Sequence, residues 1–417
     1  MTMIVTKVIA VKDPVKSTRD PRNGPNIAFF GGGTGNGDLL RTCLAQLSWN
    51  LNVIIPTSDN GGSSLGIRTV LESFERGGGP AIGDFRAILV RIASFNLAGN
   101  LNKEVKPILD LLSFRLDKAD NELAKKQWLE ITQAAHPLWK HIPDDLQPII
   151  HSDLIEFSSV VARSKKEFNY QGACIGNMFL TGARLRMNSL TAAICLFKRV
   201  VNIPYETKII PAIDSNEPHN IACELSDKSI VYGQNEISHP GDFVDKECTE
   251  MLPSKIKRLF YYDELNRLIS PPANPAAINA IENSKLICYS MGSFWTSIMP
   301  SVILNGVGQQ IVQNNCPKLL MLGGWSDRET NNMTAIDHID AFTRTISKNN
   351  GISFDPKDLV THLLYVEGTT IPVDRCKIEK KYGISVIPVE RDIIKSTLRE
   401  PRYSTEEIIA ELDKLID

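Results

Sequence analysis

Short apolar runs along the chain alternate with glycine-rich or serine-rich loops and with segments of helical periodicity. Such continuous apolar runs are typical of strands that are buried on both faces, as in a parallel sheet covered by helices. We therefore predict an α/β fold of Rossmann-like type, with a mostly parallel sheet and helices on both faces. The predicted strands are 27–30, 52–55, 286–289, 319–322, 363–366 and 384–387.

Two stretches depart from this alternation. Residues from about 117 to 167 are polar and helix-prone, which indicates a helical insertion. Residues from about 200 to 270 hold short alternating runs with turn signals, which favour a small β or mixed subdomain. Residues 1–25 are expected to form a disordered leader, and residues 26–417 to form the main domain with its two additions.

Composition narrows the class of protein. The chain has 417 residues and a formal net charge of -2, so its overall charge attracts neither nucleic acid nor an anionic membrane. Its 8 cysteines are scattered without metal-binding or redox spacing, which favours a reducing compartment. No apolar run reaches the roughly 18–20 residues of a membrane helix. We expect a soluble, cytoplasmic protein with a small-molecule ligand, and a homodimer is compatible with the sequence.

The first candidate site is the glycine-rich loop after the first predicted strand. Glycines let the backbone approach a ligand closely, and free N–H groups at the start of a helix favour a phosphate. The loop lacks the lysine of a P-loop and the third glycine of a dinucleotide fingerprint, which disfavours a P-loop NTPase mechanism. Its candidate phosphate-binding residues are Gly31, Gly32, Gly33, Thr34, Gly35 and Asn36.

Two further loops carry carboxylates. Asp59 follows the second predicted strand, where a dinucleotide fold keeps its ribose-binding acid, and it is equally suited to bind magnesium beside phosphates. Asp84 fits either the N-cap of a helix or a carboxylate that binds a metal or acts as a base. The accompanying candidates for phosphate binding are Asn60, Gly61, Gly62, Ser63, Ser64, Arg68, Gly83 and Arg86.

Two more loops complete the set. Gly176 and Asn177 open a predicted helix, and Gly292 and Ser293 follow a predicted strand. Because ligands of parallel sheets bind outside the carboxyl ends of the strands, we expect all five loops to converge on one crevice. A long anionic ligand, such as a nucleotide or nucleotide sugar, suits such a crevice. Of the 7 histidines, His338 is the one that we retain as a functional candidate.

The order of these loops resembles the CofD-like family, which includes 2-phospho-L-lactate transferase and the bacterial gluconeogenesis factor. The family's Gly-Gly-Gly-Thr-Gly loop comes first, followed by its Asp-(Asn/Asp)-Gly-Gly-Ser-Ser, Gly-Asp-Ile-Arg, Gly-Asn-Leu and Gly-Ser-Leu-Tyr-Thr-Ser segments and its Glu-Thr and Asp-His pairs. The matching segments of this chain are 31–35, 59–64, 83–86, 176–178, 292–297, 329–330 and 337–338.

The chain departs from the family pattern in three places. Ala173 and Cys174 stand where the UDP-sugar branch often has His-Ser, and Ala81 and Ile82 interrupt the usual Pro-Pro-Gly-Asp stretch. The 117–167 insertion is absent from compact members of the family. The base of the nucleotide and the acceptor are therefore left open.

The resemblance implies a nucleotide-binding, magnesium-assisted transferase that acts on a group linked to a nucleotide diphosphate, with GDP or a UDP-sugar as the ligand. Asp59 and Asp84 are then the candidate catalytic residues and the candidate magnesium ligands. Arg68 and Arg86 would orient phosphoryl oxygens, and Ser293 would help to fix the donor. Two alternatives stay open: a non-catalytic UDP-sugar-binding regulator of the gluconeogenesis-factor type, and an NAD-dependent oxidoreductase, which rests on the glycine loop and Asp59 alone.

Overall fold

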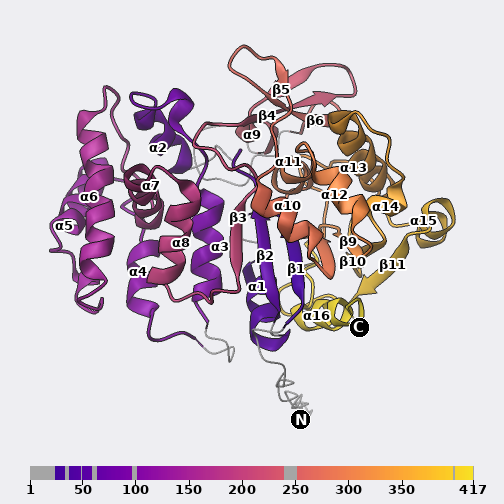
Figure 1. Ribbon diagram of the computed structural model, residues 1–417, viewed down its shortest axis with the longest axis horizontal. Helices are drawn as coiled ribbons and strands as arrows, with labels where there is room; N and C mark the ends of the chain where they lie inside the picture. The colour runs from indigo at the N-terminus through magenta and orange to yellow at the C-terminus, as the bar shows by residue number, and fades with distance from the viewer. Residues whose placement is uncertain are drawn as a thin grey trace, which may run out of the picture.

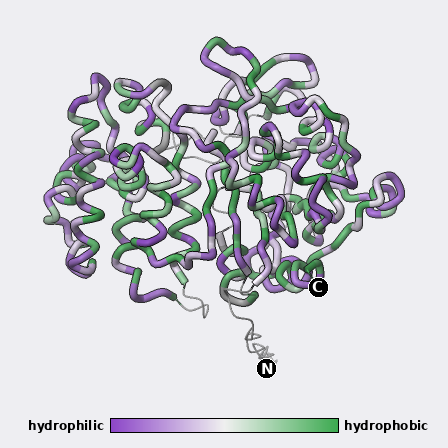
Figure 2. Tube along the Cα trace, viewed as in Figure 1, coloured by the Kyte–Doolittle hydropathy of each residue, from purple (hydrophilic) through white to green (hydrophobic). Residues whose placement is uncertain are grey.

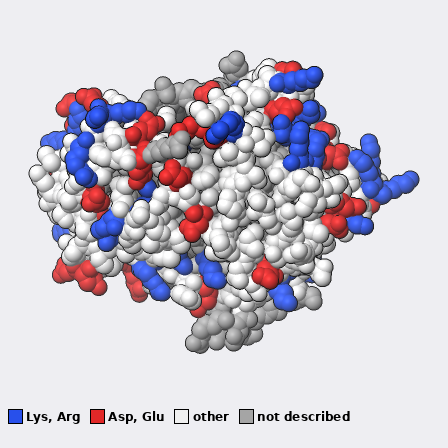
Figure 3. Space-filling view, turned by 45° about the horizontal axis from the view of Figure 1, so that its top comes forward, with Lys and Arg blue, Asp and Glu red and all other residues white. Residues whose placement is uncertain are grey.

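A computed structural model describes seven parts of the chain: residues 24–32, 37–47, 49–58, 63–95, 101–238, 251–397 and 400–416. Most of the predicted leader lies outside these ranges. In the described part of the chain, no helix is both long and apolar enough to cross a membrane. Acidic and basic side chains are interspersed on the face shown in Figure 3, which agrees with the small net charge.

Seven parallel strands form the larger sheet, in the order β11-β10-β9-β8-β1-β2-β3 (Figure 1). Numbered by their position along the chain, these strands follow the doubly wound order 3-2-1-4-5-6, with one further strand at the end. The prediction of a mostly parallel sheet is confirmed. The strands are β1 Asn26–Phe30, β2 Asn50–Ile55, β3 Lys208–Pro211, β8 Leu286–Tyr289, β9 Lys318–Met321, β10 His362–Val366 and β11 Ser385–Val389.

The central strands are buried on both faces, which explains their continuous apolar runs. Along β1, Ile27 and Phe29 belong to the hydrophobic core on one face of the sheet. Ala28 and Phe30 belong to the core on the other face, because successive side chains of a strand point in opposite directions. In Figure 2 most helices carry both hydrophilic and hydrophobic stretches, as expected of helices with one side on a core.

Helices cover both faces of the sheet. The first core receives side chains from α1 Gly37–Thr42, the π-helix η3 Cys43–Leu47, α2 Ser63–Leu71, α3 Gly83–Ala93, α4 Lys106–Ser113, α5 Asn121–Thr132, α6 Gln147–Arg163, α7 Ile175–Met187, α8 Leu190–Val200 and α16 Thr405–Lys414. The second receives them from α10 Pro275–Glu282, the π-helix η6 Phe294–Ile298, α11 Met299–Val302, α12 Val307–Gln313, α13 Ala335–Asn350, α14 Pro356–Leu359 and α15 Arg375–Tyr382. In Figure 1 α3, α7 and α8 lie on one side of β1 and β2 while α10 and α12 lie on the other.

The stretch predicted as a helical insertion, 117–167, contains α5, a short turn of 3-10 helix and α6. Trp128 of α5 packs edge-on against Phe157 of α6, with 5.9 Å between the ring centroids. Asp153 of α6 is fully buried, and its Oδ1 accepts a hydrogen bond of 2.7 Å from Nε of Arg186 in α7. Burial raises the pKa of Asp153, although Arg186 opposes that shift. This ion pair joins the 117–167 stretch to the helices that cover the sheet.

A smaller antiparallel sheet has the order β5-β4-β6-β7. Its elements are β4 Asn220–Leu225, β5 Ile230–Tyr232, β6 Ile256–Tyr262, β7 Leu268–Ile269 and the short helix α9 Gln234–Ser238. The stretch predicted as a small subdomain also included the residues of β3. These residues instead pair with β2 at the edge of the larger sheet, because three of the four are buried there.

A buried ion pair fixes the segment that leads into α3. The guanidinium of Arg184 in α7 donates two hydrogen bonds to the carboxylate of Glu75, over 3.1 Å to Oε1 and 2.7 Å to Oε2. The Arg184 side chain is 2% exposed and that of Glu75 is 26% exposed. A Cβ added to Gly79 would lie only 3.0 Å from Nη2 of Arg184, so the chain passes close to this pair just before α3.

We expect Arg184→Met to destabilise the fold by about 3 kcal/mol, since it leaves the Glu75 carboxylate without its partner in a largely buried position. Urea unfolding followed by circular dichroism would measure this change. Lys106→Ala is the matched control, because Lys106 and Asp110 form an exposed pair on α4 that contributes less than about 1 kcal/mol. Equal effects of the two substitutions would show that the buried pair does not hold this segment.

Candidate functional site

The order of the strands reverses between β1 and β8, which are neighbours in the sheet but continue to opposite edges. Ligands of doubly wound sheets bind at such a switch point, outside the carboxyl ends of the strands. Gly31 follows β1, and its φ of 141° is one that side-chain-bearing residues rarely adopt. The N–H of Ser290, directly after β8, donates a 3.0 Å hydrogen bond to the carbonyl of Phe30. A Cβ added to Gly292 would lie 3.6 Å from the carbonyl oxygen of Gly32, so the two loops are in contact.

Asp84 lies directly against the backbone of the first glycine loop. A Cβ added to Gly32 would come within 1.9 Å of Oδ2 of Asp84, so only glycine leaves room for this carboxylate. Asp84 stands in the first turn of α3, whose N-cap is Ile82. The interpretation of Asp84 as a helix cap is therefore wrong. Its carboxylate lies beside Gly32, at the carboxyl end of β1.

Arg86 and Asn177 connect α3 to the start of α7. Nε of Arg86 donates a 3.2 Å hydrogen bond to Oδ1 of Asn177, which is buried in the first turn of α7. A Cβ added to Gly176 would lie 3.0 Å from Cγ of Arg86 and 2.3 Å from the carbonyl oxygen of Leu112. Glycine at this position lets the N-terminal ends of α3 and α7 approach each other beside Asp84.

Ser293 is the N-cap of η6, the π-helix that follows β8. The predicted candidates Gly292 and Ser293 thus lie after β8, next to the glycine loop. His338 lies close by in α13, and its ring packs edge-on against Phe294 of η6 with 4.9 Å between centroids. Nδ1 of His338 lies 2.8 Å from the carbonyl oxygen of Thr334, and burial lowers the pKa of the imidazole.

Arg68 has a different set of neighbours from the other candidates. Its guanidinium donates to the carbonyl of Gly77 at 3.2 Å and to Oδ1 of Asn220 at 3.3 Å. These bonds connect α2 to the start of β4 in the smaller sheet. The expected contact of Arg68 with a phosphate stays a prediction.

Several predicted residues fall outside the described part of the chain. They belong to the middle of the glycine loop and to the loop after β2, and for two serines at the start of α2 only the backbone is described. The residues outside are Gly33, Thr34, Gly35, Asn36, Asp59, Asn60, Gly61 and Gly62, and the two serines are Ser63 and Ser64. Gly83, in contrast, is described and is the first residue of α3.

The structure contains a buried cluster of polar side chains that the sequence does not predict as part of the site. The carboxyl group of Glu329, in the loop after β9, accepts a 2.7 Å hydrogen bond from Oγ1 of Thr296 in η6 and another from Oγ of Ser238 in α9. Burial raises the pKa of Glu329 to about 7, and the nearby Asp327 adds to that shift. The resemblance had matched Glu329 to a Glu-Thr pair, but nothing in the sequence connected it to Ser238.

The described residues can supply part of a magnesium site. No group of three or more His, Cys, Asp or Glu side chains within the described ranges is arranged to hold a metal ion. Magnesium, however, usually takes one or two carboxylates and completes its shell with water and substrate phosphates. Asp84, placed against the backbone of Gly32, fits the role of one such carboxylate.

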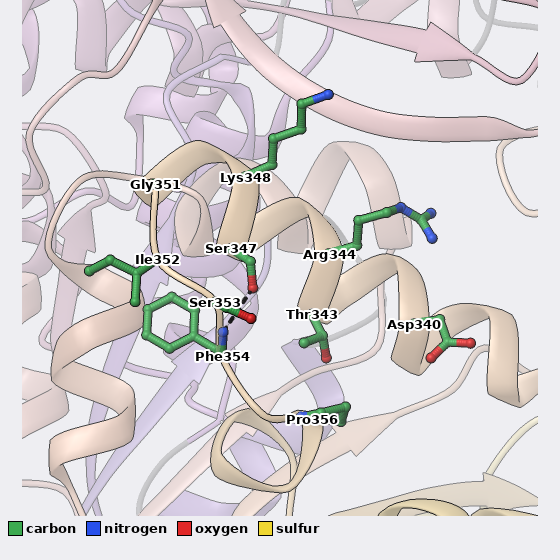
Figure 4. Close-up of a pocket in the computed structure, with 10 residues that line it drawn as sticks. All are labelled: Asp340, Thr343, Arg344, Ser347, Lys348, Gly351, Ile352, Ser353, Phe354 and Pro356. Atoms are coloured by element: carbon green, nitrogen blue, oxygen red, sulfur yellow. Dashed lines mark hydrogen bonds between the residues drawn. The ribbon is translucent and has the colours of Figure 1, made fainter.

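A separate groove of about 620 Å³ lies on the outer side of α13, against the loop 351–356 (Figure 4). Arg344, Ser347, Lys348 and Phe354 are among its lining residues. Because α13 runs from the end of β9 back toward the start of β10, the second half of this helix lies toward the amino ends of the strands. The groove contains none of the predicted site residues and is distinct from the switch point between β1 and β8.

Comparisons with known proteins agree with this fold. The model of the family 2-phospho-L-lactate transferase CofD matches residues 27–406. The Saccharomyces cerevisiae protein YNL011C is 28% identical over 85% of this chain and 93% of its own length. The gluconeogenesis factors of Listeria monocytogenes and Bacillus subtilis are each 24% identical, over 85% and 88% of this chain and 83% and 86% of their own lengths.

Among solved structures, protein BH3568 from Bacillus halodurans, a member of the UPF0052 family, superimposes with a TM-score of 0.65. That alignment covers 94% of this chain and 99% of BH3568 at 20% identity, and so it supports the fold. The family match extends over most of the chain, and the chain therefore belongs to the CofD family. The resemblance inferred from the ordered loops is confirmed.

The contact between Gly32 and Asp84 can be tested directly. We expect Gly32→Ala to displace the Asp84 carboxylate and to lower the affinity for the nucleotide ligand at least tenfold, with a melting temperature within a few degrees of wild type. Titration calorimetry and a thermal melt would measure the two quantities. Gly66→Ala is the control, since its Cβ would stay 3.4 Å from Phe168. Unchanged affinity in Gly32→Ala would mean that this position of Asp84 is irrelevant to binding.

Proposed function

We propose that this protein is a nucleotide-binding transferase of the CofD type, which acts with magnesium on a group linked to a nucleotide diphosphate. One observation carries the proposal: the Asp84 carboxylate lies against the glycine backbone at the carboxyl end of β1, at the switch point of the sheet. Family membership gives the reaction class its support.

The position of Asp84 also supports the magnesium ion in this proposal. The backbone of Gly31 and Gly32 is where a pyrophosphate would approach the sheet, and a carboxylate beside a pyrophosphate repels it unless a cation lies between them. Magnesium bound to Asp84 would neutralise the charge that develops on the phosphate oxygens. Asp59, from the loop after β2, would be the second carboxylate, as a further magnesium ligand or as a base toward the acceptor hydroxyl.

The remaining described residues have roles that follow from their positions. Arg86, held by Asn177, would orient an oxygen of the phosphate from the α3 side. Ser293, at the start of η6, would contact the donor from the β8 side. Together these groups surround the crevice with backbone N–H groups, one cation and one carboxylate, which suits a pyrophosphate-linked ligand better than a neutral one.

A non-catalytic regulator is the second candidate function. The gluconeogenesis factors of Listeria monocytogenes and Bacillus subtilis match more than four fifths of this chain, and the residues at the switch point suit binding without turnover equally well. Such a regulator would hold a UDP-sugar in the same crevice. Formation of a product separates it from the transferase.

The experiment is isothermal titration against GDP, GTP, UDP-N-acetylglucosamine and NAD, each with and without magnesium. We expect magnesium-dependent binding of a guanine nucleotide, and Asp84→Asn should weaken it at least tenfold by removing a magnesium ligand. Asp110→Asn, on the exposed side of α4, is the control and should bind as wild type does.

The other possible results of this titration would favour a different function. Tight binding of the UDP-sugar without turnover would replace the transferase by the regulator. Binding of NAD alone would favour the oxidoreductase. Absence of binding across the whole panel would contradict the proposal of a nucleotide site.

A further inference from the structure

Three oxygen atoms from distant parts of the chain form a closed ring at Glu329. Its Oε1 accepts from Oγ1 of Thr296 and from Oγ of Ser238, and these two hydroxyl oxygens are 2.9 Å apart. The other carboxyl oxygen, Oε2, accepts a 3.1 Å hydrogen bond from the backbone N–H of Thr296. Glu329 is 4% exposed, so water does not compete for these bonds. The ring joins η6, α9 and the loop after β9.

The neighbouring residue strengthens the connection to α9. Nε of Arg328 donates a 3.1 Å hydrogen bond to the carbonyl of Ile237, and Nη2 donates a 3.3 Å bond to the carbonyl of Glu236. These are among the last carbonyls of α9, which a short helix cannot satisfy by itself. Arg328 and Glu329 thus hold α9, which precedes β6 in the chain, against the loop after β9.

The ring also acts on the proposed nucleotide site. Thr296 stands in the first turn of η6, three residues after Ser293, and its N–H is one of the free amides at the start of that helix. The carboxyl group of Glu329 accepts the hydrogen bond from this amide and so holds the first turn of η6 in place. We therefore expect a change at Glu329 to shift the turn at Gly292 and Ser293.

Counting hydrogen atoms shows that the ring depends on the protonation of Glu329. With a neutral carboxyl group that carries its proton on Oε1, this oxygen donates to one hydroxyl and accepts from the other, so three hydroxyl hydrogens serve the three oxygen–oxygen contacts. With an ionised carboxylate, only two hydrogens remain, and a negative charge is buried among neutral groups. The neutral form is therefore the one that closes the ring.

Burial and the negative charge of Asp327 oppose the ionised form of Glu329, whereas the hydrogen bonds from Ser238 and Thr296 favour it, and the net effect is a raised pKa. Asp327 is negative and raises the pKa of Glu329. The pKa of the Cys223 thiol in β4 is raised to about 12, mainly by burial, so this thiol is neutral. Burial likewise keeps His338 neutral, and the guanidinium of Arg328 is directed at the carbonyls of α9. The groups on the surrounding elements are Cys223, Glu236, Asp327, Arg328, Asp337 and His338.

We propose that Glu329 is a positioning residue of the nucleotide site that takes up a proton when an anionic nucleotide binds beside η6. The inference rests on the proposed function, since it concerns the same crevice. A nucleotide phosphate near Ser293 would be repelled by an ionised Glu329, because both negative charges would lie beside the same turn of η6. A neutral Glu329 does not repel the phosphate, and it still holds η6 and α9 together.

The expected pH dependence follows from the raised pKa of Glu329. Because the folded-state pKa lies above the unfolded value, the stability that this group contributes is full at low pH and is lost as pH rises through about 7. Where binding requires the neutral form, the apparent dissociation constant at pH 8 is about tenfold that at pH 6. Glu329→Gln, which stays neutral, should bind with the same affinity at both pH values.

Calorimetric titration with GDP and magnesium at pH 6, 7 and 8, in two buffers of different ionisation enthalpy, tests the proposal. Wild type should take up about one proton on binding at pH 8, and Glu329→Gln should take up none. The nucleotide's own protons cancel in this comparison, because both proteins bind the same ligand. Asp337→Asn is the control and should keep the wild-type pH profile, since that carboxylate caps α13.

A second variant keeps the test independent of how well Glu329→Gln folds. Ser238→Ala removes one donor to the carboxylate and so should move the fall in affinity to higher pH. Equal pH profiles and equal proton uptake in wild type, Glu329→Gln and Ser238→Ala would overturn the inference and leave the proposed function intact. Absence of nucleotide binding at every pH would overturn both.

Discussion

The pairing of β1 with β8 is the interaction on which the rest of the structure depends. These strands lie side by side in the middle of the larger sheet, although some 260 residues separate them in the sequence, and both are buried on both faces. Because parallel strands end at the same edge, the pairing brings the glycine loop after Phe30 and the turn after Tyr289 into contact. The sheet then continues in opposite directions from this pair, so the switch point lies where these two loops meet.

Close packing around this edge explains why glycine occupies several of the positions there. Gly32 leaves space for the carboxylate of Asp84, and Gly176 lets α7 approach Arg86. The same packing removes charged groups from water, and these groups are stabilised by different kinds of partner. Arg184 pairs with Glu75, whereas Glu329 is surrounded by hydroxyl groups and an amide. A carboxylate with neutral partners is the one whose protonation can respond to a ligand.

Most of the sheet could be predicted from the sequence, because strands buried on both faces leave continuous apolar runs. The run at 286–289 coincides with β8, and the run at 27–30 differs from β1 by one residue. The convergence of the loops after these strands followed from the rule that parallel strands end at one edge. The sequence predicts both Asp84 and Gly32 as site residues, but it does not predict their contact, because that contact depends on where α3 lies against the sheet.

Other features depend on pairings that no local pattern encodes. Residues 208–211 alternate like a strand of a small antiparallel sheet, and only their pairing with β2 assigns them to the larger sheet. Arg68 was expected to face a phosphate, and its bond to Asn220 joins positions that are 152 residues apart. The ring at Glu329 unites three distant segments in the same way. Composition and spacing alone could not bring Ser238 next to Thr296.

The central claim is that a nucleotide binds where β1 and β8 end. Amide hydrogen exchange, followed by mass spectrometry with and without the nucleotide, tests it most directly. Peptides that cover 28–32 and 290–297 should exchange more slowly with the nucleotide present, while the groove-lining segment 343–356 should be unaffected. Protection confined to 343–356 would contradict the claim and move the binding site to the groove on α13.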